Sequence, residues 1–371
     1  MAQYMEQYRG ALASQHLKQL LENEAIQIEQ PLFADQLQPA SLDLRLGEIA
    51  YRVRTSFLPG IGRSVQTCID KLAMHKIDLC NGAVLEKGCV YIVPLQESLA
   101  LPSTLAAAAN PKSSTGRLDV FTRLITDNAR EFDQVVAGYK GKLYAEICPQ
   151  TFSILVRSGS RLSQLRVRAG ESFLDDFEHV QLHQTRQLTN DKISDEYVRG
   201  GIPLTADVLG EDNDGLIGYR AKRHAGVIDV DKVGECGISD FWEAIYINKE
   251  SKNSGLILDP GEFYILASRE AVHVPVDHAA EMVAYDNLVG EFRVHYAGFF
   301  DPGFGAPEAG GKGSRAVLEV RSYEVPFLLE HGQYVGRLVY ECLSEMPETV
   351  YGAGLSSNYQ SQGLKLSKHF R

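Results

Sequence analysis

Lys112, Ser113, Ser114 and Arg117 stand close together in the stretch NPKSSTGRLDV, residues 110–120. Serine hydroxyls and backbone N–H groups bind phosphate oxygens, and an arginine can hold an anion with two parallel hydrogen bonds. A glycine among them lets a ligand approach the backbone closely. The same residue types are common in turns and at helix starts, and taken alone they favour that structural interpretation. The stretch is therefore either a polar turn or a cradle for an anionic group.

Two glutamates lie inside apolar runs that resemble β-strands, Glu146 in LYAEI and Glu319 in AVLEV. Burial disfavours the charged form of a carboxyl group, which suits such a group to move protons near neutral pH. The alternative is an outward-facing charge on an alternating strand. An internal repeat weakens this alternative, because it places a glutamate at the same position twice.

The chain contains two similar halves. Residues 84–114 align with residues 257–287, with a turn, a Tyr-Ile pair, a strand and a proline in register. Residues 142–167 align in the same way with residues 316–341, and this alignment matches the two glutamates. Generic β alternation is the competing explanation, but it would not keep the order and spacing of turns over about 80 residues. We therefore expect an internal duplication.

The elements that would position these residues are mostly strands. A helical pattern spans about residues 4–24, and short apolar runs separated by Gly, Pro, Asn and Asp follow it. Such runs are typical of a β-barrel or sandwich. We expect a mainly β protein with a first repeat at residues 1–170, a connector at 171–221 that could add strands, and a second repeat at 222–371.

Composition narrows the class of protein. The 371 residues carry a formal net charge of −11, and no basic face of the kind that binds nucleic acid is apparent. Six cysteines without a CxxC pair indicate free thiols and argue against a structural zinc site. No apolar run reaches the roughly 20 residues that cross a bilayer, and the polar N-terminus does not resemble a signal peptide. We therefore expect a cytoplasmic protein without a nucleic-acid or membrane partner.

Three stretches resemble known motifs without matching them. HAAE (278–281) lacks the spacing and the cysteine pair of zinc-dependent nucleoside deaminases, and GFFDPGFGAPEAGGKG lacks the ending of a Walker loop. GVIDVDKVG (226–234) looks like the uracil-binding motif of dUTPases. Its place before LILDPGEFYIL indicates instead a second copy of ASLDLRLG, with Asp229 near the place of Asp43.

Taken in order, ASLDLRLG, VLEKGCVYIVPLQESLALP and KSSTGR resemble the dCTP deaminases of the dUTPase-like superfamily. In the second half, HYAGFFDPGFG (295–305), AVLEV (316–320) and YGAGLSSNYQSQG (351–363) resemble that family's nucleoside hairpin, catalytic-glutamate strand and C-terminal lid. The resemblance covers most of the chain apart from the connector. It implies two tandem distorted β-barrel or jelly-roll repeats, and a homo-oligomer with three-fold or pseudo-three-fold symmetry and active sites between neighbouring subunits.

The same resemblance implies an activity. The enzyme would be a hydrolase acting on a cyclic amidine C–N bond, converting dCTP to dUTP and ammonia. It would need no catalytic zinc, and Mg²⁺ would accompany the triphosphate. A dUTP diphosphatase, a bifunctional enzyme that carries dCTP to dUMP, and a catalytically inactive nucleotide-binding relative remain the alternatives.

The resemblance also assigns roles to single residues. The catalytic positions of the family are matched by Ser113, Arg117, Glu146 and Glu319. The substrate-binding positions are matched by Lys112, which replaces the usual arginine, Ser114, Ala297, Asp301, Tyr351 and Gln362. Asn358 stands where the family often has a lysine.

The two halves depart from the family pattern in complementary ways. The second-half counterpart of the Ser-Ser-x-x-Arg motif reads Ala284, Tyr285 and Leu288. The first-half counterpart of the hairpin lacks DPGF, with Thr126 or Ala129 in the place of Ala297. We therefore hypothesise a composite active site. The first half would supply the phosphate-binding motif, and the second half would supply the hairpin, Glu319 and the lid.

Overall fold

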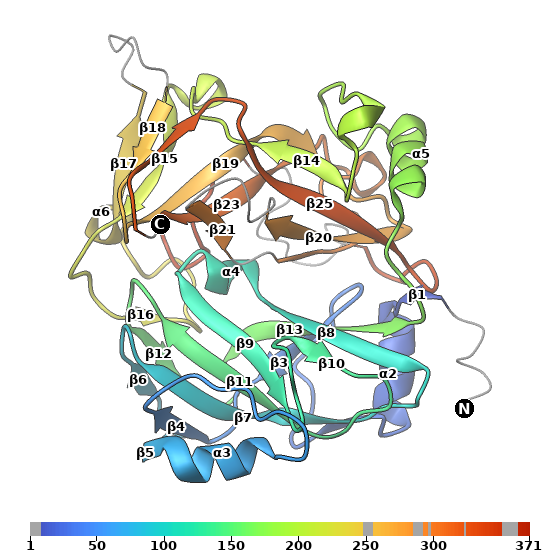
Figure 1. Cartoon of the computed structure of the whole chain (residues 1–371), viewed down its shortest axis with the longest axis vertical. Helices are drawn as coiled ribbons and strands as arrows, with labels where there is room; N and C mark the ends of the chain where they lie inside the picture. Colours follow the sequence, from blue (N-terminus) through green and yellow to red (C-terminus); the bar gives the residue numbers. More distant parts are fainter. Residues whose placement is uncertain (1–8, 248–254, 285–291, 296–297, 323, 351–362) are drawn as a thin grey trace. The chain divides into compact units, whose positions relative to one another are not determined.

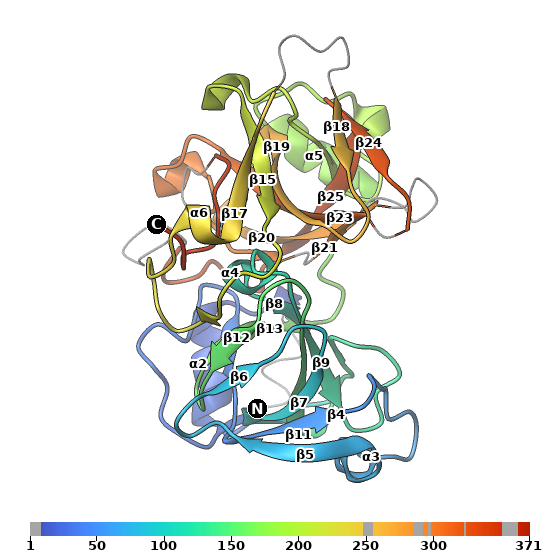
Figure 2. The same cartoon turned by 90° about the vertical axis from the view of Figure 1, so that its left-hand side faces the viewer.

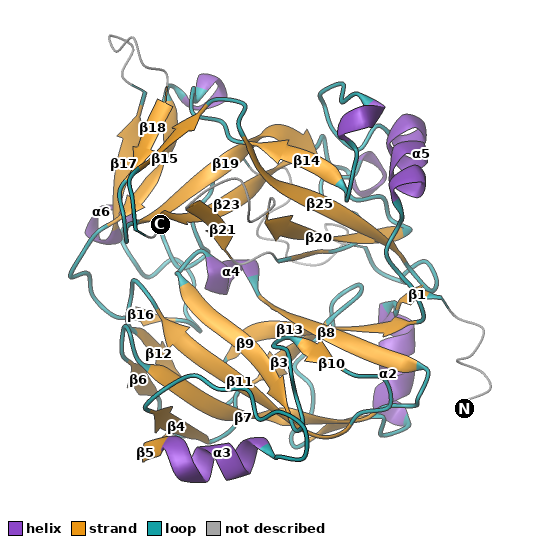
Figure 3. Cartoon of the chain, in the orientation of Figure 1, coloured by secondary structure: helices purple, strands orange, loops and turns teal. Residues whose placement is uncertain are grey.

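The computed structural model describes residues 9–247, 255–284, 292–295, 298–322, 324–350 and 363–371. They form two compact units (Figure 1). The first unit takes the chain up to Ser172, together with Gly226–Glu235 and Cys342–Glu348. The second takes Phe173–Ala225, Cys236–Glu341 and the residues from Thr349 onward. Both are built mainly from β-strands, as the sequence predicts (Figure 3).

In its described residues, the first unit holds two larger sheets and one small one. Its helices are α2 (Ser14–Glu22), α3 (Val65–Leu72) and α4 (Ser113–Gly116). Its strands are β1 (Gly10–Ala11), β2 (Ile26–Ile28), β3 (Leu42–Arg45), β4 (Ile49–Val53), β5 (Ala73–Asp78), β6 (Ala83–Leu85), β7 (Val90–Ala100), β8 (Leu105–Pro111), β9 (Val120–Thr126), β10 (Gln134–Val135), β11 (Lys140–Pro149), β12 (Ile154–Val156), β13 (Arg161–Ala169) and β16 (Ile228–Asp229). The sheet orders are β1-β13-β8-β10 with β3 on β13, β5-β4-β7-β11-β9 with β2 on β7, and β16-β12-β6.

The second unit has the same kind of arrangement. Its helical segments are α5 (Asp176–Arg186), η1 (Asp195–Tyr197), η2 (Glu211–Asn213), α6 (Ile238–Phe241) and η3 (Pro307–Ala309). Its strands are β14 (Ile202–Thr205), β15 (Leu216–Ala221), β17 (Trp242–Tyr246), β18 (Gly255–Leu258), β19 (Phe263–Val272), β20 (His278–Ala284), β21 (Phe292–His295), β22 (Phe299–Phe300), β23 (Ser314–Ser322), β24 (Phe327–Glu330) and β25 (Tyr334–Cys342). The sheet orders are β14-β25-β20-β22, β17-β15-β19-β23-β21 and β18-β24.

The order of strand pairing is the same in the two units. The order β5-β4-β7-β11-β9 corresponds strand by strand to β17-β15-β19-β23-β21, and β3-β13-β8-β10 corresponds to β14-β25-β20-β22. The antiparallel ribbon β6–β12 corresponds to β18–β24 (Figure 2). A shared order of so many long-range pairings fits an internal duplication.

Residues 173–221 belong to the second unit and contain two of the strands that the sequence analysis allowed for this stretch. β14 pairs with β25, and β15 pairs with both β17 and β19. All four residues of β14 are buried, so the strand lacks the alternation of buried and exposed residues that identifies a strand in a sequence. The connector expected at 171–221 therefore contains β14 and β15, which are integral strands of the second unit.

The stretch GVIDVDKVG is likewise not a second copy of the strand that carries Asp43. Its strand β16 pairs in parallel with β12 of the first unit. Arg157 holds Asp229 there with two hydrogen bonds of 2.7 and 2.8 Å. The second-unit strand that occupies the place of β3 is β14, because β14 pairs with β25 as β3 pairs with β13.

The helix expected at about residues 4–24 is shorter in the described residues. Strand β1 precedes it, and α2 begins at Ser14. Its residues Leu17 and Leu20 are fully buried. None of the helices in the described part of the chain is long and apolar enough to cross a bilayer.

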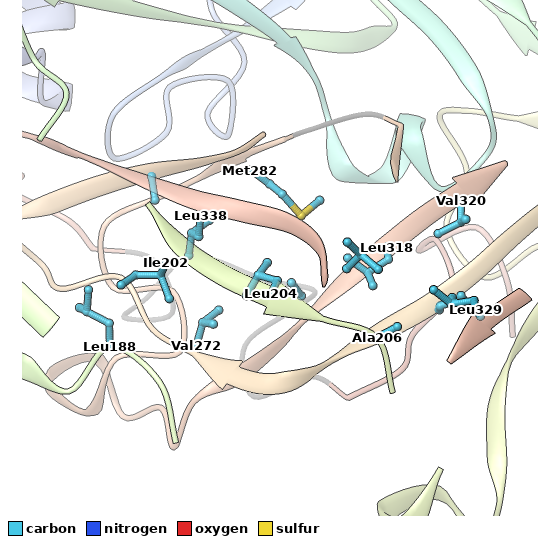
Figure 4. Close-up of a cluster of buried hydrophobic side chains, with 14 of the residues drawn as sticks. Leu188, Ile202, Leu204, Ala206, Val272, Met282, Leu318, Val320, Leu329 and Leu338 are labelled. Carbon is cyan, nitrogen blue, oxygen red and sulfur yellow. The ribbon is translucent and has the colours of Figure 1, made fainter. Parts of the chain in front are cut away.

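The core of the second unit shows how its strands present side chains. Leu204, Met282, Leu318 and Leu338 come from four different strands and pack together with other buried apolar residues (Figure 4). Leu318 and Val320 both belong to this core. Since successive residues of a strand point to opposite faces, Glu319 between them points away from the apolar core.

Helix α5 offers a test of local stability. The Asp175 carboxylate accepts the Glu178 N–H at 2.8 Å, and the Glu178 carboxylate accepts the Asp175 N–H at 2.9 Å. We expect Asp175→Ala to lower the free energy of unfolding by about 1 kcal/mol, because the Glu178 N–H loses the side-chain acceptor that caps the helix. Asp175→Ser should stay within a few tenths of a kcal/mol. Urea unfolding followed by circular dichroism measures both, and equal losses would contradict the capping role.

Candidate active site

The Ser-Ser-x-x-Arg motif forms one helical turn, α4, directly after β8. Thr115 and Gly116 donate their N–H groups to the Lys112 carbonyl at 2.8 and 3.0 Å, and Arg117 donates its N–H to the Ser113 carbonyl at 3.1 Å. Ser114 and Arg117 are buried, whereas Ser113 is half-buried. The motif is therefore an ordered turn as the structural interpretation held, and it also fixes the position of a buried arginine.

Lys112 is held by a residue that sequence reasoning did not assign to the site. Its ammonium group forms an ion pair with Asp43, which is fully buried on β3. Arg161 on β13 lies 3.4 Å from the same carboxylate and pairs with Asp35 at 2.8 Å. The hydrogen bonds from Arg161 keep the pKa of Asp35 below its usual value. The charge of Lys112 is thus positioned by a strand almost 70 residues earlier in the chain.

The two glutamates occupy equivalent positions in the two units. Glu146 on β11 pairs with Arg123 on β9, and Glu319 on β23 pairs with His295 on β21. On the other side, each glutamate faces the isoleucine of a Tyr-Ile pair, on β7 and on β19 respectively. Glu146 is 1% exposed and Glu319 is 3% exposed. An outward-facing charge is therefore excluded for both.

Glu146 forms an ion pair with Arg123, and Arg123 in turn stacks on an aromatic ring. Arg123 donates from Nε and Nη2 to Glu146 Oε1 at 3.1 and 2.5 Å. The Arg123 guanidinium carbon lies 3.9 Å from the centre of the Phe132 ring. The next residue, Asp133, accepts the Leu124 N–H at 2.7 Å. Nothing in the sequence pattern singled out Arg123, although its place opposite Glu146 follows once the pairing of β9 with β11 is known.

Asp133 should make the stability of the protein depend on pH. Desolvation by the surrounding protein raises the pKa of its carboxyl group from 3.8 to about 7. The folded state therefore binds a proton that the unfolded state releases between these two values. We expect the free energy of unfolding to fall as the pH rises through this window, by up to about 1.4 kcal/mol per pH unit.

Asp133→Asn should remove this slope, since the amide cannot titrate. Urea unfolding of both proteins at a series of pH values measures the difference. Parallel stability curves for the two proteins would contradict the raised pKa.

The first-half counterpart of the nucleoside hairpin can now be placed. The Asp133 carbonyl accepts the Ala109 N–H at 2.9 Å, and the Gly298 carbonyl accepts the Met282 N–H at 3.4 Å. Ala109 and Met282 align in the two halves, so Gly298 corresponds to Asp133. Counting back one residue matches Ala297 with Phe132. Neither Thr126 nor Ala129 takes that place, because strand β10 sets the register and the lengths of the two hairpins differ.

The remaining predicted residues are only partly described. Asp301 follows β22, is 9% exposed, and accepts the Phe304 N–H through its carbonyl at 3.1 Å. The following predicted positions lie outside the described residues: Tyr285, Leu288, Ala297, Tyr351, Asn358 and Gln362. Each unit is described by itself, so the composite site stays a prediction.

The donors at α4 suit an anion more than a resident metal ion. Ammonium, guanidinium and hydroxyl groups bind phosphate oxygens, whereas Mg²⁺ prefers carboxylates and carbonyls. In the part of the chain that the structure describes, no three His, Cys, Asp or Glu side chains come together as a metal site would require. These residues fit a Mg²⁺ ion that arrives bound to the phosphates of a nucleotide.

Two family models together match almost the whole chain. The N-terminal domain of 2'-deoxycytidine 5'-triphosphate deaminase matches residues 8–171, and the C-terminal domain of the same enzyme matches residues 175–370. The chain belongs to the dCTP deaminase family. The gap between the two models falls where the first structural unit gives way to the second, at Ser172 and Phe173.

Solved and curated dCTP deaminases agree with this family. The crystal structure of the 2'-deoxycytidine 5'-triphosphate deaminase from Agrobacterium tumefaciens is 57% identical and covers 92% of this chain and 100% of its own, with a TM-score of 0.86. A "dCTP deaminase, dUMP-forming" from Beutenbergia cavernae is 32% identical over 114 residues, which is 30% of this chain and 55% of that protein. One from Kocuria rhizophila is 36% identical over 110 residues, which is 29% and 53% respectively. The chain thus spans about half the length of these curated relatives.

Proposed function

We propose that this protein hydrolyses the 4-amino group of dCTP to give dUTP and ammonia, with Glu319 as the group that transfers protons. The observation that carries the proposal is the buried position of Glu319 on β23. Glu319 also belongs to the half of the chain that retains the hairpin sequence DPGF. The family supplies the substrate class. Glu146 occupies the same register in the first unit and is the competing candidate.

In the proposed mechanism, Glu319 takes a proton from water, and the water oxygen attacks C4 of the cytosine ring. The carboxyl group gives this proton to N3, then takes the proton of the new hydroxyl group at C4 and gives it to the departing amine. Collapse of the tetrahedral intermediate releases ammonia and leaves a carbonyl group at C4. No electron carrier is needed, because the overall reaction exchanges an amine for a water oxygen.

The phosphate-binding residues would act at the other end of the nucleotide. Lys112 and Ser114 would bind the triphosphate together with Mg²⁺, and Arg117 and Ser113 would orient the water and the carboxylate. A net charge of −11 makes such a local group of donors necessary for an anionic substrate. Ala297, Asp301, Tyr351 and Gln362 complete the proposed substrate contacts. We further propose a cytoplasmic enzyme that assembles with three-fold or pseudo-three-fold symmetry.

A second candidate function follows from the names of the curated relatives, which are "dCTP deaminase, dUMP-forming". A bifunctional enzyme would go on to cleave dUTP to dUMP and pyrophosphate. The dUTP formed by deamination would be the substrate of this second step, and the same phosphate-binding residues would hold it.

Incubation with dCTP and Mg²⁺ separates the candidates when ammonia, dUTP, dUMP and pyrophosphate are followed together. Equal release of ammonia and dUTP supports the simple deaminase. Equal release of ammonia, dUMP and pyrophosphate supports the bifunctional enzyme. Nucleotide binding without any product would overturn both and leave a nucleotide-binding relative.

A further inference from the structure

Two large residues lie beside Glu146 in the first unit, and the aligned second-half sequence has smaller residues at their positions. Arg123 lies opposite Glu146, where the second unit has His295 opposite Glu319. Phe132 is matched in the sequence by Ala297, which lies outside the described residues and has only a methyl group as its side chain. The first half therefore has an arginine and a phenylalanine where the second-half sequence has a histidine and an alanine.

These two residues form a connected group around the carboxylate. Arg123 directs two N–H groups at Glu146 Oε1, and its guanidinium group stacks on the Phe132 ring. The Arg123 Nη2 group also lies 3.3 Å from the Ser56 hydroxyl. Charge-assisted hydrogen bonds and cation–π stacking reinforce one another when the cation is held between an anion and a ring. The arginine is therefore held on two sides.

In the described residues, neither carboxylate oxygen of Glu146 is open to a water molecule from solvent. Oε1 of Glu146 accepts both hydrogen bonds from Arg123. Oε2 is sealed from solvent and has no hydrogen-bond partner among the described residues. A carboxylate that removes a proton from water needs an oxygen directed at that water. Glu146 does not meet this requirement in the described arrangement, because Oε1 is held by Arg123 and Oε2 is closed to solvent.

We propose that Arg123 and Phe132 form a plug that closes the first unit around Glu146, so that each chain has a working carboxyl group in its second unit only. This inference rests on the proposed function, because it names which of two equivalent glutamates performs that reaction. Within the first unit, Glu146 then has a structural role as the counter-charge of Arg123.

Carboxyl labelling tests the plug without any assay of activity. A water-soluble carbodiimide with glycine amide would be applied to the native protein, and peptides carrying Glu146 and the exposed Glu131 would be compared by mass spectrometry. We expect Glu146 to be labelled at least about tenfold more slowly than Glu131, because the plug excludes the reagent. Labelling at the rate of Glu131 would overturn the inference.

Variants that remove the plug sharpen this test. The double substitution of Arg123→His and Phe132→Ala gives the first unit the residue types of the second, and we expect labelling of Glu146 to rise at least about fivefold while Glu131 is unchanged. Arg123→Lys keeps a cation and serves as a second variant if the double variant does not fold. Because lysine cannot make the two hydrogen bonds of Arg123, labelling of Glu146 should rise in Arg123→Lys, but less than in the double variant. Unchanged labelling of Glu146 in a folded variant would overturn the plug.

Deamination of dCTP tests the plug independently of the labelling. Phe132→Ala alone should deaminate dCTP within about twofold of the wild type, because the plug does not touch the working carboxyl group. A loss of about tenfold or more, in a variant that melts at the wild-type temperature, would overturn the inference. If the wild type does not deaminate dCTP, the proposed function fails, and the labelling still decides whether the plug exists.

Discussion

Glu319→Gln should reduce kcat for dCTP deamination by about 10²–10⁴-fold, because the amide cannot take a proton from water or return it to the base. The substitution preserves the size of the side chain, so KM should change little. Steady-state kinetics with ammonia as the measured product gives both constants. Binding of dUTP to the variant serves as a control for a folded site.

The matched variant is Glu146→Gln, which changes the same residue type in the same register of the other unit. If Glu146 is the counter-charge of Arg123, its loss should act on stability, and kcat should stay within a few-fold of the wild type. Full activity of Glu319→Gln together with inactivity of Glu146→Gln would reject both the composite site and the proposed role of Glu319.

Arg117→Lys should reduce kcat/KM for dCTP by about 10- to 100-fold, the second-largest effect that we expect. Lysine retains the positive charge but not the planar group that makes two parallel hydrogen bonds. Arg117 is buried directly after α4. A lysine at this position is held by the surrounding residues and cannot shift to restore the lost hydrogen bonds. Steady-state kinetics measures the loss.

The control for this prediction is Arg220→Lys, which changes an arginine that pairs with Glu243 near the surface. Such a surface pair contributes little, so kcat/KM should stay within about twofold. If Arg117→Lys lowers the melting temperature and leaves kcat/KM unchanged, Arg117 supports the fold of the first unit and does not contact the substrate.

The register of the two glutamates illustrates what each kind of information contributes. The alignment of residues 142–167 with 316–341 predicted that Glu146 and Glu319 are equivalent, and the strand pairings place them so. Sequence could not show that Arg123 neutralises one of them. Arg123 is 23 residues away from Glu146, and only the pairing of β9 with β11 brings the two together.

The second-unit counterpart of β3 is a feature that the sequence did not identify correctly. GVIDVDKVG looked like the copy because short β sequences share the same residue types. The strand that takes this place is β14, in a polar stretch that resembled a connector. The interpretation of GVIDVDKVG was wrong, whereas the strands left open for the connector stretch are present, and the difference has a physical reason. The partner of a strand is chosen by contacts with residues far away in the chain, and local composition does not record that choice.

The sequence by itself determined the family, the mainly β architecture, the duplication, the Ser-Ser-x-x-Arg motif and the pair of glutamates. These features are carried by residue types, periodicity and spacing, which are local properties of the chain. The tertiary structure decided which strands pair, that Asp43 holds Lys112, and that Arg123 and Phe132 surround Glu146. Those contacts depend on long-range backbone pairing, which brings together side chains whose separation in the sequence carries no signal.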